Sequence, residues 1–250
     1  MLGMPDDHEG GRSRADGFAT THWSVVLLAG DCSTRESRQA LEALCATYWP
    51  PLYAYARRRV KDPDEAQDLT QSFFARLLEK NYVDSATPDR GRFRAFLLTA
   101  FKHFLSNHWA QERAWKRGGG RAPIPLDFES ADERRRIEPC AGLTPEQLYD
   151  RQWAVTLLDQ ILQRLESEFI REGKGELFAQ LRGFVIGESP ATTYAAVAAR
   201  LGSTEGAVKM AAHRMRRRYR ELLREEIART VGGPGEVDDE IRKLFDALKM

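Results

Sequence analysis

The sequence contains little cysteine and no long apolar run. Its three cysteines, Cys32, Cys45 and Cys140, are far apart and form no C-x-x-C pair, so neither a disulfide framework nor a zinc site is indicated. No stretch approaches the roughly 20 apolar residues that a membrane-spanning helix requires, and the first residues lack the apolar core of a secretion signal. We therefore expect a cytoplasmic protein with free thiols and no membrane contact.

Sequence signatures of catalysis are absent too. There is no glycine-rich phosphate loop of the G-x-x-x-x-G-K type, so the sequence contains no motif that indicates nucleotide hydrolysis. His103 and His108 are five residues apart, which on a helix turns them toward different faces, and no further ligand pair accompanies them. We expect no enzymatic activity, no cofactor and no metal. A metal-dependent enzyme built on these histidines is an alternative that stoichiometric metal in the purified protein would support.

The 250 residues include many charged side chains, and the positive and negative charges are nearly equal in number. Apolar residues make up 42% and charged residues 30%, as in a globular protein. The 38 Lys and Arg residues nearly balance the 37 Asp and Glu residues, for a net charge of +1. Because this net charge says nothing about a nucleic-acid partner, the placement of the charges decides that question.

Apolar residues recur every three or four positions, the spacing of amphipathic helices, and no run in the first half of the chain alternates with the period of a strand. A helical pattern covers about residues 38 to 60, with a break or kink at Pro50 and Pro51 and a second helix after it, because proline disfavours a helix interior. The next helix begins with Asp62 as its N-cap, and a third begins at about Phe93. The pattern predicts an all-α fold.

Composition divides the chain into segments. Glycines, prolines and mixed charges after the third helix are typical of a flexible linker, and Thr144 then opens a new helix. At roughly 150 residues per domain, the length fits two small helical domains joined by that linker. We expect a flexible tail at 1–18, a helical domain at 19–117, a linker at 118–143, a second helical domain at 144–230 and an amphipathic C-terminal extension at 231–250. The extension caps the second domain or, as the alternative, binds a regulatory partner, and its apolar side consists of Val237, Ile241, Leu244, Phe245 and Leu248.

The second domain ends in a pattern typical of a helix-turn-helix, in which Gly202 makes the turn and either Ser203 or Thr204 can cap the second helix. The apolar stripe of that helix turns five side chains outward: Glu205, Lys209, Met210, His213 and Arg214. In the major groove, early exposed residues read base edges and later arginines meet phosphates. The arginines suited to phosphates are Arg214, Arg216, Arg217, Arg218 and Arg220. A solvated basic face is the alternative.

The segments EAQDLTQSFFARLLEK and DRGRFRAFLLTAFKHFLSNHWAQERAWKR, followed by the helix-turn-helix, resemble a bacterial RNA polymerase sigma factor of the extracytoplasmic-function group. The resemblance covers about residues 38–117 and 144–227. It implies a protein that binds core RNA polymerase and directs it to specific promoters for transcription initiation, with an anti-sigma factor as an optional further partner. A stand-alone helix-turn-helix regulator, acting as a dimer on paired half-sites, is the alternative.

The resemblance also implies three sets of site residues. The set that docks on the polymerase is Glu65, Asp68, Gln71 and Ser72. The set that contacts the minus-ten promoter element is Arg92, Arg94, Lys102, Asn107, Trp109, Arg113 and Lys116, in a stretch whose basic excess suits phosphate neutralisation. The set that contacts the minus-thirty-five element is Lys209, Met210, His213, Arg214 and Arg217.

Overall fold

The computed structural model describes residues 35–79, 92–115, 142–186 and 192–250. The helices are α2 (Arg35–Arg59), α3 (Pro63–Glu79), α4 (Phe93–Trp115), α5 (Pro145–Arg171), α6 (Gly175–Ile186), α7 (Tyr194–Arg200), α8 (Glu205–Ala228), the short 3-10 helix η4 (Pro234–Glu236) and α9 (Val237–Lys249). These described ranges contain no strand, as an all-α fold requires. The expected tail at 1–18 and nearly all of the expected linker lie outside them.

Side-chain caps determine where two of the helices begin. Before α3, the Asp62 carboxylate accepts a hydrogen bond from the Asp64 amide, as the sequence predicts. Before α5, Thr144 and Gln147 form a reciprocal capping box: each side chain accepts a hydrogen bond from the backbone amide of the other residue. Because these contacts satisfy amides that the helix leaves unpaired, both boundaries are encoded locally.

Helix α2 runs without interruption through Pro50 and Pro51, so the separate second helix expected after these prolines is not formed. Proline lacks an amide hydrogen and disfavours a helix interior. Here, however, both prolines are buried, and so are the neighbouring Tyr48 and Leu52. We attribute the continuation of α2 to this burial of apolar surface, which offsets the missing backbone hydrogen bonds.

Aromatic rings hold α2, α3 and α4 together. Phe73 of α3 meets Phe101 and Phe104 of α4 edge to face, with ring centroids 4.9 and 5.6 Å apart. Phe101 also contacts Tyr55 of α2 at 6.0 Å. Since edge-to-face pairs are favourable beyond the area that they bury, this cluster fixes the buried side of α3 and leaves its opposite side to solvent.

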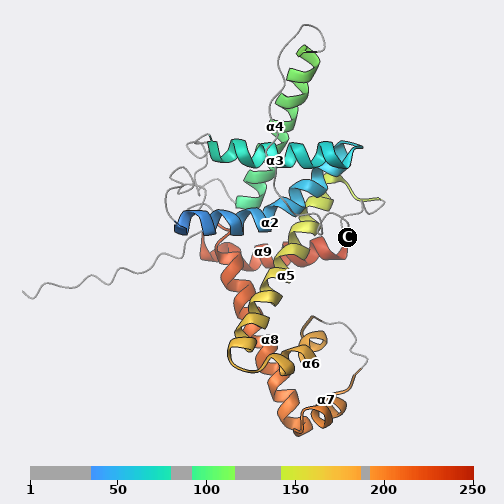
Figure 1. The fold of residues 1–250 in the computed structure, drawn as a ribbon, viewed down its shortest axis with the longest axis vertical. Helices are drawn as coiled ribbons and strands as arrows, with labels where there is room; N and C mark the ends of the chain where they lie inside the picture. The colour runs from blue at the N-terminus through green and yellow to red at the C-terminus, as the bar shows by residue number, and fades with distance from the viewer. Residues whose placement is uncertain (1–34, 80–91, 116–141, 187–191) are drawn as a thin grey trace, which may run out of the picture.

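Helix α5 connects the two ends of the molecule. Figure 1 shows it as a long diagonal that packs on α2 and reaches α6 and α8 toward its other end. Its buried residues run along most of its length: Leu148, Tyr149, Trp153, Ala154, Leu157, Ile161, Leu162 and Leu165. The core of the described residues is therefore continuous from α2 to α9, and the two-domain arrangement is not confirmed.

The C-terminal segment folds back against this central helix. Helix α9 packs on α5 and α8 and buries Val237, Leu244 and Ala247. The residues just before it reach the start of α4, where the Phe93 amide donates a hydrogen bond to the Thr230 carbonyl at 3.0 Å. The C-terminal segment thus contacts both the helix that follows the linker and the last helix that precedes it.

The capping box of α5 makes a stability prediction. Replacing Thr144→Ala leaves the Gln147 amide without its acceptor and should lower the free energy of unfolding by about 1 kcal/mol, measured by urea denaturation. Ser167→Ala is the matched control, because its hydroxyl bonds to the Gln163 carbonyl within the same helix; we expect a change within about 0.5 kcal/mol. Equal losses in both variants would show that the box does not stabilise α5.

Candidate nucleic-acid and polymerase interfaces

Helices α7 and α8 are joined by a tight turn. Gly202 in this turn has φ of +59°, a left-handed conformation that glycine adopts without strain. Thr204 then caps α8 by accepting a hydrogen bond from the Ala207 amide at 3.2 Å. The two helices pack together at the end of the molecule opposite α4 (Figure 1).

Helix α8 exposes the face that the sequence assigns to the minus-thirty-five element. All five residues of that set are exposed: Lys209, Met210, His213, Arg214 and Arg217. Lys209 pairs with Glu205 at 2.6 Å and Arg217 with Glu221 at 3.5 Å. Exposed pairs of this kind are weak, so both cations stay available to an anionic ligand. No residue in the described part of the chain pairs with Arg214.

Two of the arginines expected to meet phosphates instead brace α8 against its neighbours. Arg218 forms a two-pronged contact with the Glu168 carboxylate of α5, with both N–O distances at 2.9 Å. Arg216 donates to the Phe184 carbonyl of α6 and to the Tyr194 hydroxyl of α7. Their guanidinium groups already have partners within the protein, so their contact with DNA phosphates stays a prediction.

Helix α3 presents the predicted docking set on its outer side. Glu65, Asp68 and Ser72 are exposed and Gln71 is half-buried, while Leu69 and Phe73 on the other side enter the core. A polar, partly acidic helix face is suited to a basic partner surface.

The predicted minus-ten set is divided between the surface and the interior. Along α4, Asn107 and Arg113 are exposed, and Trp109 is half-buried against the core. Lys102 pairs with Glu146 of α5 at 2.7 Å, and more than a third of each side chain remains exposed. Lys116 lies outside the described residues.

Arg92 and Arg94, at the start of α4, differ from that expectation. Arg94 is 9% exposed; its guanidinium pairs with Glu240 of α9 and Asp150 of α5 and lies 4.7 Å from the ring centre of Trp153. Arg92 Nε lies 2.5 Å from Glu240 Oε2. In this conformation both arginines therefore face carboxylates of the C-terminal half rather than a free surface, and their contact with the minus-ten element stays a prediction.

The charges of this buried cluster stabilise one another. Burial alone would lower the pKa of Arg94, but the hydrogen bond to Glu240 and the charges of Asp150 and Glu240 raise that pKa above its ordinary value. The pKa of Asp150 is raised by burial, against the opposing effect of Arg94. The guanidinium of Arg94 thus remains charged, and the cluster holds together as ion pairs.

Sequence reasoning missed Glu240 because an acidic residue on an amphipathic helix normally faces water. Its spacing contained a signal, however. Val237, Glu240, Leu244 and Ala247 follow one another at intervals of three, four and three, and all four are buried. The apolar stripe expected on this helix also included Phe245, whose side chain remains 45% exposed. The buried side of α9 is therefore rotated toward Glu240.

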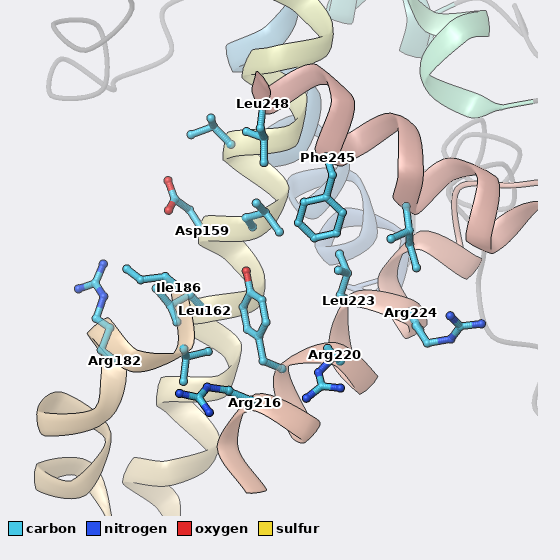
Figure 2. Close-up of a pocket in the computed structure, with 15 residues that line it drawn as sticks. Asp159, Leu162, Arg182, Ile186, Arg216, Arg220, Leu223, Arg224, Phe245 and Leu248 are labelled. Carbon is cyan, nitrogen blue, oxygen red and sulfur yellow. The ribbon is translucent and has the colours of Figure 1, made fainter. Parts of the chain in front are cut away.

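A groove of about 660 Å³ runs between α5, α6, α8 and α9. Figure 2 shows Leu223 and Phe245 in its interior and Arg182 and Arg216 near its edge. Part of its wall is therefore the outer side of α9, which packs less completely here than around Glu240. The groove lies toward the C-terminal end of α8, away from the exposed residues that begin at Lys209.

Neither a metal centre nor a membrane span is found in the described residues. No three His, Cys, Asp or Glu side chains within those ranges are grouped to hold a metal ion. His103 is exposed, and His108 stacks on Phe104 with ring centroids 6.3 Å apart. None of the helices in those ranges combines the length and the apolar character needed to cross a bilayer.

The fold and these surfaces define an all-helical protein with an exposed basic helix face, as found in proteins that bind duplex nucleic acid. Residues 44–114 match the family model for sigma-70 region 2, from within α2 to the end of α4. This match supports a sigma factor of the sigma-70 family, whose region 2 binds core RNA polymerase and promoter DNA. No curated protein and no solved structure matches the chain.

The different surroundings of two arginines on α8 predict different effects on stability. Arg218→Ala removes the two-pronged contact with Glu168 and should lower the free energy of unfolding at pH 7 by about 1 kcal/mol. Arg214→Ala removes an exposed side chain and should change it by less than about 0.5 kcal/mol. Urea denaturation measures both, and equal effects would contradict the bracing role.

The Arg218 effect should also depend on pH. The hydrogen bond from Arg218 holds the pKa of Glu168 below its ordinary value of 4.5. A carboxylate with a lowered folded-state pKa stabilises the fold above its unfolded-state pKa, and this contribution is lost as the pH falls through the folded-state pKa. The stability difference between the unmodified protein and Arg218→Ala should therefore shrink below about pH 4.5. A difference that stays constant during acidification would contradict this assignment.

Proposed function

We propose that this protein is a sigma factor of the extracytoplasmic-function group, which binds core RNA polymerase and directs it to specific promoters. The observation that carries the proposal is the region 2 match at residues 44–114, followed in the same chain by a capped helix with an exposed basic face. A sigma factor needs one surface for the polymerase and two for the promoter. The protein then has no catalytic chemistry of its own and acts in the cytoplasm, with an anti-sigma factor as a possible regulator.

In this proposal α7, the Gly202 turn and α8 form a helix-turn-helix that reads the minus-thirty-five element. The early exposed residues of α8 enter the major groove, where Lys209 and Arg214 can bond to base edges. Arg217 stands about two turns further along the helix than Lys209 and meets a phosphate. The weak pairs of Lys209 and Arg217 with glutamates would be exchanged for contacts with DNA.

The same proposal places the polymerase on α3 and the minus-ten element on α4. Glu65, Asp68 and Ser72 supply a polar docking face. On α4, Asn107 and Arg113 are exposed, and Trp109 can offer part of its ring to an unpaired base. Lys102 and Lys116 would add positive charge to this surface.

The α8 surface is tested with Arg214→Ala. We expect a loss of promoter affinity of about tenfold or more in complex with core polymerase, since a good side-chain contact to a base contributes about 1–3 kcal/mol. The loss should be smaller on DNA of unrelated sequence. The control is Arg182→Ala on α6, an exposed arginine at the rim of the groove, which should bind like the unmodified protein. Filter binding measures all three proteins, and equal losses on every DNA would contradict base recognition by Arg214.

The α3 surface is tested with Asp68→Ala. Removing this carboxylate should weaken binding to core polymerase severalfold, because a charge at a complementary interface is lost. Glu166→Ala, an exposed acid on α5, is the control and should leave that affinity unchanged. Fluorescence anisotropy of the labelled protein with core polymerase measures both. An unchanged affinity in Asp68→Ala would remove this residue from the docking surface.

The dimeric regulator is separated from the sigma factor by footprinting. A sigma factor should be monomeric and protect promoter DNA only together with core polymerase. A dimer that protects paired half-sites without polymerase would contradict the proposal and support the stand-alone regulator.

A further inference from the structure

Three contacts tie the start of α4 to the C-terminal segment. Glu240, which is 0% exposed, pairs with both Arg92 and Arg94. Between these two arginines, the Phe93 amide donates to the Thr230 carbonyl. One carboxylate of α9 thus neutralises two cations of the helix that carries the end of region 2. We call this set of contacts the Glu240 contact.

Another anion could replace the Glu240 carboxylate as the partner of Arg92 and Arg94. Arg92 Nε and Glu240 Oε2 lie close together but lack hydrogen-bond geometry, so the pair with Arg92 is poorly aligned. Ion pairs removed from water gain little net stability over the hydrated ions. If α9 leaves, the arginines regain water or take another anion, and Glu240 is hydrated in turn.

The outer side of helix α9 is packed incompletely. Its outer side forms part of the groove wall, where Phe245 remains 45% exposed. The connection from α8 contains Gly232, Gly233 and Gly235, and a side chain added at either Gly233 or Gly235 would meet no neighbouring atom within 4 Å. Detachment of α9 would expose Val237, Leu244 and Ala247, but α5 would keep its packing against α2, α6 and α8.

We propose that α9 is an autoinhibitory helix that competes with DNA for the start of α4. With α9 docked, Glu240 occupies Arg92 and Arg94. When α9 detaches, DNA phosphates replace the Glu240 carboxylate and the two arginines join the basic surface of α4. This inference rests on the proposed function, in which α4 lies against promoter DNA. It gives the C-terminal segment a role distinct from both promoter-binding surfaces.

The test compares Glu240→Gln with Asp239→Asn in the full-length protein. The control makes the same carboxylate-to-amide change at the neighbouring position, where Asp239 is exposed and pairs only with Arg242 among the contacts of the described residues. The probe is a fluorescent 30-base-pair duplex of arbitrary sequence, bound by the protein alone over a range of salt concentrations. We expect Glu240→Gln to bind at least about tenfold more tightly, with a slope of log affinity against log salt steeper by roughly 2, since two further phosphates are neutralised. Asp239→Asn should match the unmodified protein.

Hydrogen exchange reports detachment without DNA. The backbone amides of α9 should exchange faster in Glu240→Gln than in either the unmodified protein or Asp239→Asn, because a detached helix of 13 residues is only marginally stable in water. Leu244→Ala weakens the docking of α9 through a buried apolar residue and tests the inference independently if Glu240→Gln fails to fold. It should likewise raise both the DNA affinity and the exchange rate of the α9 amides.

Two results would overturn the inference. One is unchanged exchange of the α9 amides in the folded Glu240→Gln variant, which would mean that this contact does not hold α9. The other is faster exchange with unchanged or weaker DNA binding, which would mean that detachment does not expose a DNA-binding surface. Failure of the proposed function looks different: neither the unmodified protein nor any variant would then bind core polymerase.

Discussion

A carboxylate that is withdrawn from water must be paired, and the carboxylate of Glu240 is buried completely. Its partners come from the start of α4, about 150 residues earlier in the chain, since Arg94 lies 146 positions from Glu240. The requirement to neutralise this one group therefore links the C-terminal helix to α4, the last helix of the segment that matches region 2. Together with the buried length of α5, it holds the two halves of the described structure in one arrangement.

In this arrangement the charged faces of α3 and α8 are exposed, whereas the arginines at the start of α4 are paired with acids inside the protein. In the proposed function, the exposed faces of α3 and α8 would contact polymerase and DNA as they stand, because within the described residues their charges have no partner or only weak surface pairs. The start of α4 cannot, because Arg92 and Arg94 are held by acids of α5 and α9. If the proposed function and the proposed role of α9 both hold, Arg92 and Arg94 bind promoter DNA only after α9 detaches.

Short-range sequence patterns predict the helix caps, the turn and the exposed helix face. The caps at Asp62 and Thr144, the turn at Gly202 and the exposed face of α8 all follow from spacing and residue type within one or two helical turns. The sequence could not reveal which charges meet across the fold. Arg218 and Arg94 belong to basic stretches that suit phosphate binding, and only the positions of Glu168 and Glu240 give them another role. Pro50 and Pro51 lie inside α2 because tertiary burial outweighs a local preference.

In the proposed function, this chain gives core RNA polymerase a promoter preference. The most direct measurement is transcription in vitro of the source organism's own genomic DNA by core polymerase, with and without the purified full-length protein, with transcript 5′ ends located by sequencing. A promoter-directing factor should give a discrete set of new start sites that appear only with the protein and share sequence elements upstream. An identical set of start sites in both reactions, with a protein that is folded and monomeric, would contradict it.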